Sequence, residues 1–372
     1  MSPTAAGNLV TPGPTPPQIA AVEHDVEKVR GFTYERPVAV EAITQTEMAA
    51  RLRASSRESL PASFLRRRST AWQTIGVIPP DADLRAVLLK FQTGQIAGYY
   101  DPNTGELVYV GTTQLNVMDE FVLAHELTHA IDDQHFNLRR LNKLNASCRD
   151  DDQQAALGAI EGSAQYFATQ VLLRFPGALA PDGGSSGGSL EGIPPFVTTL
   201  ELWPYTAGQA FITAREADGG LRSVNDAIRH LPVSTEQVMH AERYPSDRPQ
   251  PVDIPDLGPA LGAGWHDLDV QQVGEEWLKA MLALRLDDDV AATAAAGWGG
   301  GIYRAWTDGK HAAVLMRTTW DTPADATEFG AAVDDWLSKG STPSFVGRPD
   351  EFTVEIGFGS DSETEAKLEE AA

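Results

Sequence analysis

The stretch that decides the fold is residues 121–136, which read FVLAHELTHAIDDQHF. Within it, His125, Glu126 and His129 form an H-E-x-x-H motif. Residues four apart lie on one face of an α-helix, so both imidazoles can reach one metal ion. Glu126 then lies beside that ion, where it can accept a proton from a bound water. The apolar residues of the stretch largely follow helical spacing, so we predict a buried helix with a zinc site.

A catalytic zinc ion normally has three protein ligands, so the motif needs a third one. Glu161 is the first candidate. It lies in a second stretch with apolar residues at helical spacing, far enough from His129 for a loop and a return helix. A carboxylate beside the apolar stripe of that helix needs a partner, because an unpaired buried charge is costly. The small residues Gly158, Gly162 and Ala164 would let two helices approach closely.

His135 is the alternative third ligand. Residues 125–135 resemble the metzincin spacing H-E-x-x-H-x-x-G-x-x-H, except that Asp132 replaces the glycine whose turn brings the third histidine to the metal. Asp enters the left-handed conformation less readily than Gly. Met239, the candidate for a metzincin methionine turn, lies in a stretch that reads as helix. The sequence therefore favours Glu161 and leaves His135 open.

The segment Leu123–Phe136, with the later Glu161-Gly-x-Ala164, resembles the gluzincin type of zincin metallopeptidase. More narrowly, it is similar to a group of poorly characterised bacterial proteins with H-E-L-T-H-A, D-Q-H-F and E-G-D-A motifs. Three further stretches fit that group: Gly98–Pro102, Ser234–Gln237 and Gly297–Gly300. The resemblance spans about residues 30–340 and implies a zincin-like core that holds Zn²⁺ through His125, His129 and Glu161.

Two positions depart from that group. Ser163 stands where an acidic residue could orient a ligand, which puts that orienting role in doubt. Gly301 and Ile302 follow Gly-Trp-Gly-Gly where the group has an Asp-Arg pair.

The resemblance implies hydrolysis of peptide bonds by a zinc-bound water, with Glu126 as the general base. A further donor should stabilise the oxyanion of the tetrahedral intermediate. His240 and Tyr205 are the candidates, because related enzymes place a His or Tyr downstream of the third-ligand helix. A zinc-binding interaction or assembly protein without activity is the alternative. The presence of Glu126 argues against it, because a purely structural site needs no base.

Composition restricts the partners. The formal net charge of the 372 residues is −23, which argues against nucleic-acid binding, since that needs a basic surface. A peptide or protein substrate is therefore expected, and the oligomeric state stays open. The single cysteine, Cys148, excludes an internal disulfide, and no apolar run approaches the roughly 20 residues of a membrane helix. Residues 1–17 are rich in Pro, Thr and Gly, without signal-peptide features.

We expect an exported protein, secreted or lipid-anchored, whose signal is absent from this chain. A cytoplasmic location is the alternative.

The predicted elements indicate an α+β fold with a zincin-like metallopeptidase core and a small C-terminal α+β unit. Its parts are a flexible tail and first helix (1–30), the catalytic domain (31–245), a proline-rich linker (246–260), the C-terminal unit (261–358) and an acidic disordered tail (359–372). A hairpin of residues 96–100 and 106–110 directly precedes the metal helix. Its edge is expected to pair with an extended substrate.

Overall fold

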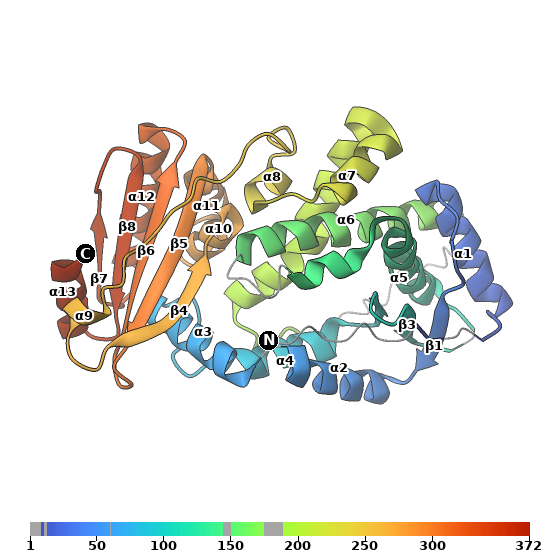
Figure 1. Ribbon diagram of the computed structural model, residues 1–372, viewed down its shortest axis with the longest axis horizontal. Coiled ribbons are helices and arrows are strands. Elements are labelled where there is room, and N and C mark those ends of the chain that lie inside the picture. The colour runs from blue at the N-terminus through green and yellow to red at the C-terminus, as the bar shows by residue number, and fades with distance from the viewer. Residues whose placement is uncertain (1–8, 11–12, 60, 113, 144–149, 175–188) are drawn as a thin grey trace.

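Two β-sheets, each packed against helices, build an α+β protein, as the sequence predicts (Figure 1). The computed structural model describes residues 9–10, 13–59, 61–112, 114–143, 150–174 and 189–372. Cys148 and nearly all of the predicted flexible loop at 181–189 lie outside these residues. Within them, no helix is long and apolar enough to cross a membrane.

The first sheet has three strands in the order β1-β3-β2: β1 (Ala39–Ile43), β2 (Gly98–Asp101) and β3 (Glu106–Val110). β1 runs parallel to β3, and β2 runs antiparallel to it. The hairpin between β2 and β3 is the predicted one, and Gly105 turns it with a φ of 70°, a conformation that favours glycine. β2 is therefore an edge strand, and it packs against the helix that carries the H-E-x-x-H motif.

A helical layer lies against this sheet. It contains α1 (Pro17–Arg30), α5 (Val117–Phe136), α6 (Asp150–Arg174), α7 (Pro195–Arg229) and the short α8 (Thr235–Met239). α5 and α6 are the two helices that carry the predicted metal ligands. α7 is the longest of the described helices. The helices share one apolar core, which includes Val26, Leu127, Ala159 and Phe211. α2 (Gln45–Ser59) and α3 (Ala62–Ile75) are separate helices, because Pro61 precedes α3 and would interrupt a continuous helix.

The second sheet is antiparallel, with strand order β4-β5-β6-β8-β7. Its strands are β4 (His266–Gln272), β5 (Trp298–Thr307), β6 (Ala312–Trp320), β7 (Ser344–Gly347) and β8 (Thr353–Gly359). β5 and β6 form an antiparallel hairpin. α10 (Glu275–Ala283) begins shortly after β4 ends at Gln272. α11 (Asp288–Ala295) and α12 (Pro323–Ser338) follow.

The boundary predicted at residue 245 is wrong, because the second core contains helices from the first half of the chain. α3, α4 (Leu84–Gln95) and the start of α7 contribute Trp72, Phe91 and Phe196 to the core of the five-stranded sheet. Trp72 and Trp277 both pack edge-on against Phe196, with ring centroids 5.1 Å apart in each pair. Figure 1 shows α3 between the two sheets.

The acidic C-terminal tail is not disordered, which corrects the prediction made from its charge. It forms α13 (Ser362–Ala371), capped by the side chain of Asp361. Leu368 is fully buried in a small core with Trp306 and Leu315, on the sheet face opposite α10–α12. The proline-rich segment 246–260 also joins this core, through Ile254 and Leu257, and ends in α9 (Gly258–Leu261). It therefore packs on the sheet instead of forming a free linker.

Candidate metal centre

Three side chains predicted to bind metal meet between α5 and α6. His125 Nε2 lies 3.1 Å from Glu161 Oε2, His129 Nε2 lies 3.3 Å from the same oxygen, and the two Nε2 atoms are 3.2 Å apart. Both histidines are buried, and the side chain of Glu161 is largely buried as well. We call these three residues the trio.

The spacing of the trio fits a tetrahedral ion. In an ideal tetrahedron the distance between two ligand atoms is about 1.63 times the bond length. Zinc bonds of about 2.0–2.1 Å therefore require ligand atoms about 3.3–3.4 Å apart. The three observed distances lie at or just below this range. Two neutral nitrogens and one carboxylate oxygen are also ligands that zinc accepts.

Electrostatics in the trio favours a bound cation. Burial alone would raise the pKa of the Glu161 carboxyl, but the neighbouring imidazoles of His129 and His125 hold it well below its usual range. Burial would lower the pKa of His129, whereas the charge and hydrogen bond of Glu161 raise it to about 9. A proton and a metal ion compete for the same imidazole nitrogen, so metal affinity should fall as the pH drops below about 9.

Local sequence explains how the helices carry these groups. α5 begins with a capping box, in which the Asn116 side chain accepts from the N–H of Asp119 and Asp119 accepts from the N–H of Asn116. α6 lies backbone-to-backbone against α7, because a Cβ atom on Gly162 would come within 2.2 Å of the Gly208 backbone. The close approach expected from the small residues of α6 is thus present, and its partner is α7.

Glu126 lies beside the trio and against the edge strand β2. A Cβ atom on Gly98 would be 3.2 Å from Glu126 Cγ, so the strand passes directly over this side chain. Burial raises the pKa of the Glu126 carboxyl, while the two imidazoles and the backbone N–H of Tyr100 act in the opposite direction. A buried carboxyl of this kind can accept and return a proton near neutral pH.

Of the two predicted oxyanion donors, the structure brings Tyr205 to the trio. Its ring centroid lies 6.0 Å from that of His125. The negative charge of Glu161, then burial, raises the pKa of Tyr205 well above its usual value, which keeps its hydroxyl protonated. The role of Tyr205 as a donor stays a prediction.

His240 is engaged elsewhere, which does not support its predicted role. It ends α8, and its Nε2 lies 2.9 Å from Oε1 of the buried Glu275 at the start of α10. This hydrogen bond raises the pKa of His240 and ties α8 to the C-terminal sheet unit.

His135 is not the third ligand. α5 continues through Asp132 to Phe136 without the turn that a metzincin arrangement requires. At 1.5 Å per residue, His135 lies about 9 Å beyond His129 along the helix and on a different face. Its ring stacks on Phe32 with centroids 4.2 Å apart, and its Nε2 lies 2.9 Å from the carbonyl oxygen of Thr33.

Sequence reasoning missed the residues that support α5 from outside. Arg30 donates to Asp132 at 2.7 Å in a fully buried pair, and the Ser163 hydroxyl donates to the other oxygen of Asp132. Ser163 thus supports the motif helix through Asp132, although it is not acidic. Arg30 is 102 residues from Asp132 in the chain, so no local pattern could reveal the pair.

A second group, Glu236, Asp247 and Asp321, also gathers carboxylates that could surround an ion. Arg243 occupies its centre, with Nη1 at 2.6, 3.1 and 2.7 Å from the three carboxylates. The guanidinium of Arg243 already fills the space between these carboxylates, so we do not assign a second metal site here.

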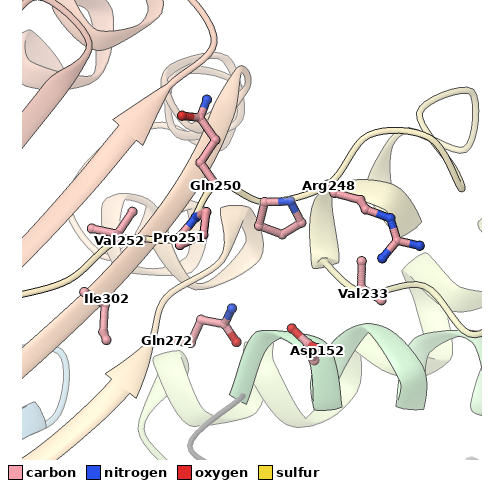
Figure 2. A pocket seen from close by; sticks show the side chains of 10 residues that line it. Asp152, Val233, Arg248, Gln250, Pro251, Val252, Gln272 and Ile302 are labelled. Carbon is pink, nitrogen blue, oxygen red and sulfur yellow. The ribbon is translucent and has the colours of Figure 1, made fainter.

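Two cavities border α6, the helix that carries Glu161. None of their lining residues belongs to the trio. The smaller one, about 400 Å³, lies under the segment 248–252. Figure 2 shows that segment above Gln272 and Asp152, with Arg248 at its side. The lining contains one acidic residue, Asp152, and one basic residue, Arg248, so it favours neither an anionic nor a cationic ligand. The larger cavity is about 690 Å³.

Comparison with protein families matches residues 264–368 to a domain of unknown function, DUF8575. The match covers the five-stranded sheet with α10–α13 and leaves the trio outside. Searches of curated proteins and of solved structures found no match.

Proposed function

We propose that the protein is a zinc-dependent metallopeptidase of the gluzincin type. The observation that carries the proposal is the tetrahedral spacing of the three trio atoms, with the buried Glu126 beside them. His125, His129 and Glu161 would hold the ion. When bound, zinc polarises a carbonyl group and makes a water molecule more acidic.

The protein's own groups would move the protons. Glu126 takes a proton from the attacking water and passes it to the leaving amine. The raised pKa of its carboxyl makes the second transfer easier than for an exposed glutamate. The protonated hydroxyl of Tyr205 donates to the oxyanion that forms on the former carbonyl oxygen.

The edge strand β2 gives the substrate a place to bind. Its inner edge pairs with β3, and its other side faces α5 near Glu126. An extended peptide could add to such an edge by main-chain hydrogen bonds, which would hold the backbone straight across the trio.

The test is Glu126→Gln, with Glu120→Gln on the same helix as the matched control. We expect the E126Q variant to keep one zinc ion per chain, because the trio is untouched, and to lose about 10²-fold or more of its turnover. E120Q should keep both the zinc ion and the turnover of the wild type. Zinc is measured by atomic emission, and turnover on an unfolded protein such as reduced casein, with and without a chelator.

Two outcomes would contradict the proposal in different ways. Full activity in E126Q would remove Glu126 as the base. A wild-type protein that holds zinc but cleaves none of a broad set of unfolded proteins would favour the zinc-binding assembly protein.

A further inference from the structure

The larger cavity lies between the two cores, among α3, α4, the start of α6, the start of α7 and α10. Figure 1 shows α3 and α10 at the side of the molecule where the five-stranded sheet meets the long helices. Its volume of about 690 Å³ is within the usual range for ligand sites, roughly 300–1,000 Å³. Much of its wall is apolar, and three aromatic residues, Phe64, Trp72 and Trp277, contribute to it.

The charges in this wall do not balance. Four acids line the cavity, Asp150, Asp151, Glu201 and Glu276, against two arginines, Arg67 and Arg68. Arg68 is already used, because it pairs with Asp150 at 2.9 Å and with Asp269, outside the lining, at 2.6 Å. Arg67 is exposed to solvent. The interior of the cavity is therefore negative once the pH exceeds about 8, because burial raises the pKa of Glu276 to about 8 and that of Glu201 to about 7.

Two of the four acids, Glu201 and Glu276, have no hydrogen bond or ion pair on their carboxylates among the described residues, although Lys279 attracts Glu276 from further away. Asp151 accepts hydrogen bonds from the backbone and hydroxyl of Thr235. Glu276 is 2% exposed, and no described atom pairs with its buried Oε2. Within the described chain, the partly exposed carboxylate of Glu201 likewise has no hydrogen bond or ion pair, so Glu276 is the buried acid that lacks one. An unpaired buried carboxylate is costly, and a cation in the cavity would supply the partner it lacks.

The apolar wall adds a second requirement. A ligand that fills this space needs a hydrocarbon portion as well as a positive charge. Aromatic rings such as those of Trp72 and Trp277 also attract cations through their faces. Lysine and arginine side chains combine an apolar stem with a charged end.

The cavity lies next to the trio along two helices. Glu201 is one turn before Tyr205 on α7, and Tyr205 lies beside His125. On α6, the lining residue Gln154 lies two turns before Glu161 and on the same face of the helix. At a rise of 1.5 Å per residue, the two residues are about 10 Å apart along the helix. An extended peptide covers that distance in about three residues.

We infer that this cavity binds a lysine or arginine side chain of the substrate, about three residues from the bond that is cut. That this side chain belongs to a substrate rests on the proposed function. The binding of a cationic side chain in the cavity does not. A free alkyl amine has the same chemistry, so the experiment separates the two sources.

Binding is measured by calorimetry on the zinc-loaded E126Q variant, so that no peptide is consumed. The probes are alanine-rich decapeptides with one lysine, matched peptides with norleucine in its place, and free pentylamine. A pH of 8.5 suits the test, because burial raises the pKa of Glu276 to about 8 and that of Glu201 to about 7. Among the other charged lining groups, Asp150 stays paired with Arg68, and Asp151 with Thr235.

We expect the lysine peptide to bind about tenfold or more tightly than the norleucine peptide, as for a desolvated charge pair. Glu201→Gln with Glu276→Gln should abolish this preference, and Glu216→Gln, elsewhere on α7, should keep it. With active enzyme, the cut should stay at a constant distance from the lysine as the lysine is moved along the peptide. That measurement needs no cavity variant to fold.

Equal binding of the lysine and norleucine peptides would overturn the inference, as would a preference that survives the double substitution. If pentylamine bound as tightly as the lysine peptide, the cavity would serve free amines and its link to the substrate would be wrong. A clear lysine preference without any cleavage by the wild type would support the cavity and contradict the peptidase proposal.

Discussion

At the scale of single residues, the trio is set by helical periodicity. His125 and His129 share a face of α5 because they are four residues apart, and Glu161 meets them from α6. His135, which follows the same motif in the chain, lies on another face because the helix does not turn at Asp132.

The third ligand gives the first residue-scale prediction. Glu161→Gln should lower zinc affinity by about 10²-fold or more, because the amide cannot supply the negative charge that the ion needs. His135→Ala should leave zinc affinity near that of the wild type, since its ring contacts Phe32 and Thr33 instead. Competition with a fluorescent zinc chelator measures both. A larger loss in H135A than in E161Q would restore the metzincin-like alternative.

Local patterns predicted the three side chains that meet in the trio, whereas contacts between distant parts of the chain could not be predicted. The two histidines and Glu126 follow from four-residue spacing, and Glu161 from an apolar stripe that needed a buried partner. Gly98, which lies against Glu126, belongs to a strand whose position depends on sheet pairing with β3. His240 was selected only for its place in the chain order, and it pairs with Glu275 instead.

At the scale of elements, the contact between α6 and α7 positions Glu161. The two helices touch through backbone at Gly158, Gly162 and Gly208, where side chains would hold them apart. The residue next to Gly162 is Glu161, the proposed third ligand, so a shift of α6 there would move it away from the histidines.

Gly162→Ala is therefore expected to destabilise the fold by about 1–3 kcal/mol or more, because the added methyl overlaps backbone that cannot move aside. It should also weaken zinc binding. Gly94→Ala, in α4, is the matched control, since no atom lies within 4 Å of its added Cβ. That control should be neutral or stabilising by up to about 1 kcal/mol. Urea unfolding measures both, and equal midpoints for the two variants would contradict the prediction.

The element order was predictable, and the element ends were less so. The β2–β3 hairpin, predicted from the sequence, is present and turns at Gly105. The C-terminal helix α13 was missed because its sequence is mostly charged, whereas the burial of Leu368 against Trp306 and the cap by Asp361 stabilise it. Tertiary contacts of this kind outweigh local propensity.

At the scale of the whole molecule, buried acids make stability depend on pH. Burial, opposed by Lys279 and reinforced by Glu275, Asp288 and Asp151, raises the pKa of Glu276 to about 8. A carboxyl whose pKa is raised in the folded state binds more protons folded than unfolded. Its contribution to stability is therefore full below about pH 4.5 and is lost as the pH rises through about 8.

Glu276→Gln should remove this loss. The variant should differ little from the wild type at pH 5.5 and be more stable at pH 8.5 by about 1–3 kcal/mol, since one pKa unit corresponds to about 1.4 kcal/mol. Glu328→Gln, on the exposed side of α12, is the control and should show no such divergence. Thermal unfolding at the two pH values provides the measurement. If the stability of E276Q and that of the wild type changed with pH in the same way, Glu276 would have a partner in solution and the prediction would be wrong.

The packing of α3 onto the five-stranded sheet bears on how such a chain could have evolved. A gene fragment encoding only residues 264–368 would produce a sheet without α3, with the core around Trp277 and Tyr303 exposed to water. Recombination could therefore have transferred this domain to another protein only if that protein covered the sheet face on which α3 packs here. Any other chain that carries the domain should encode its own helix for that place, before or after it in the gene.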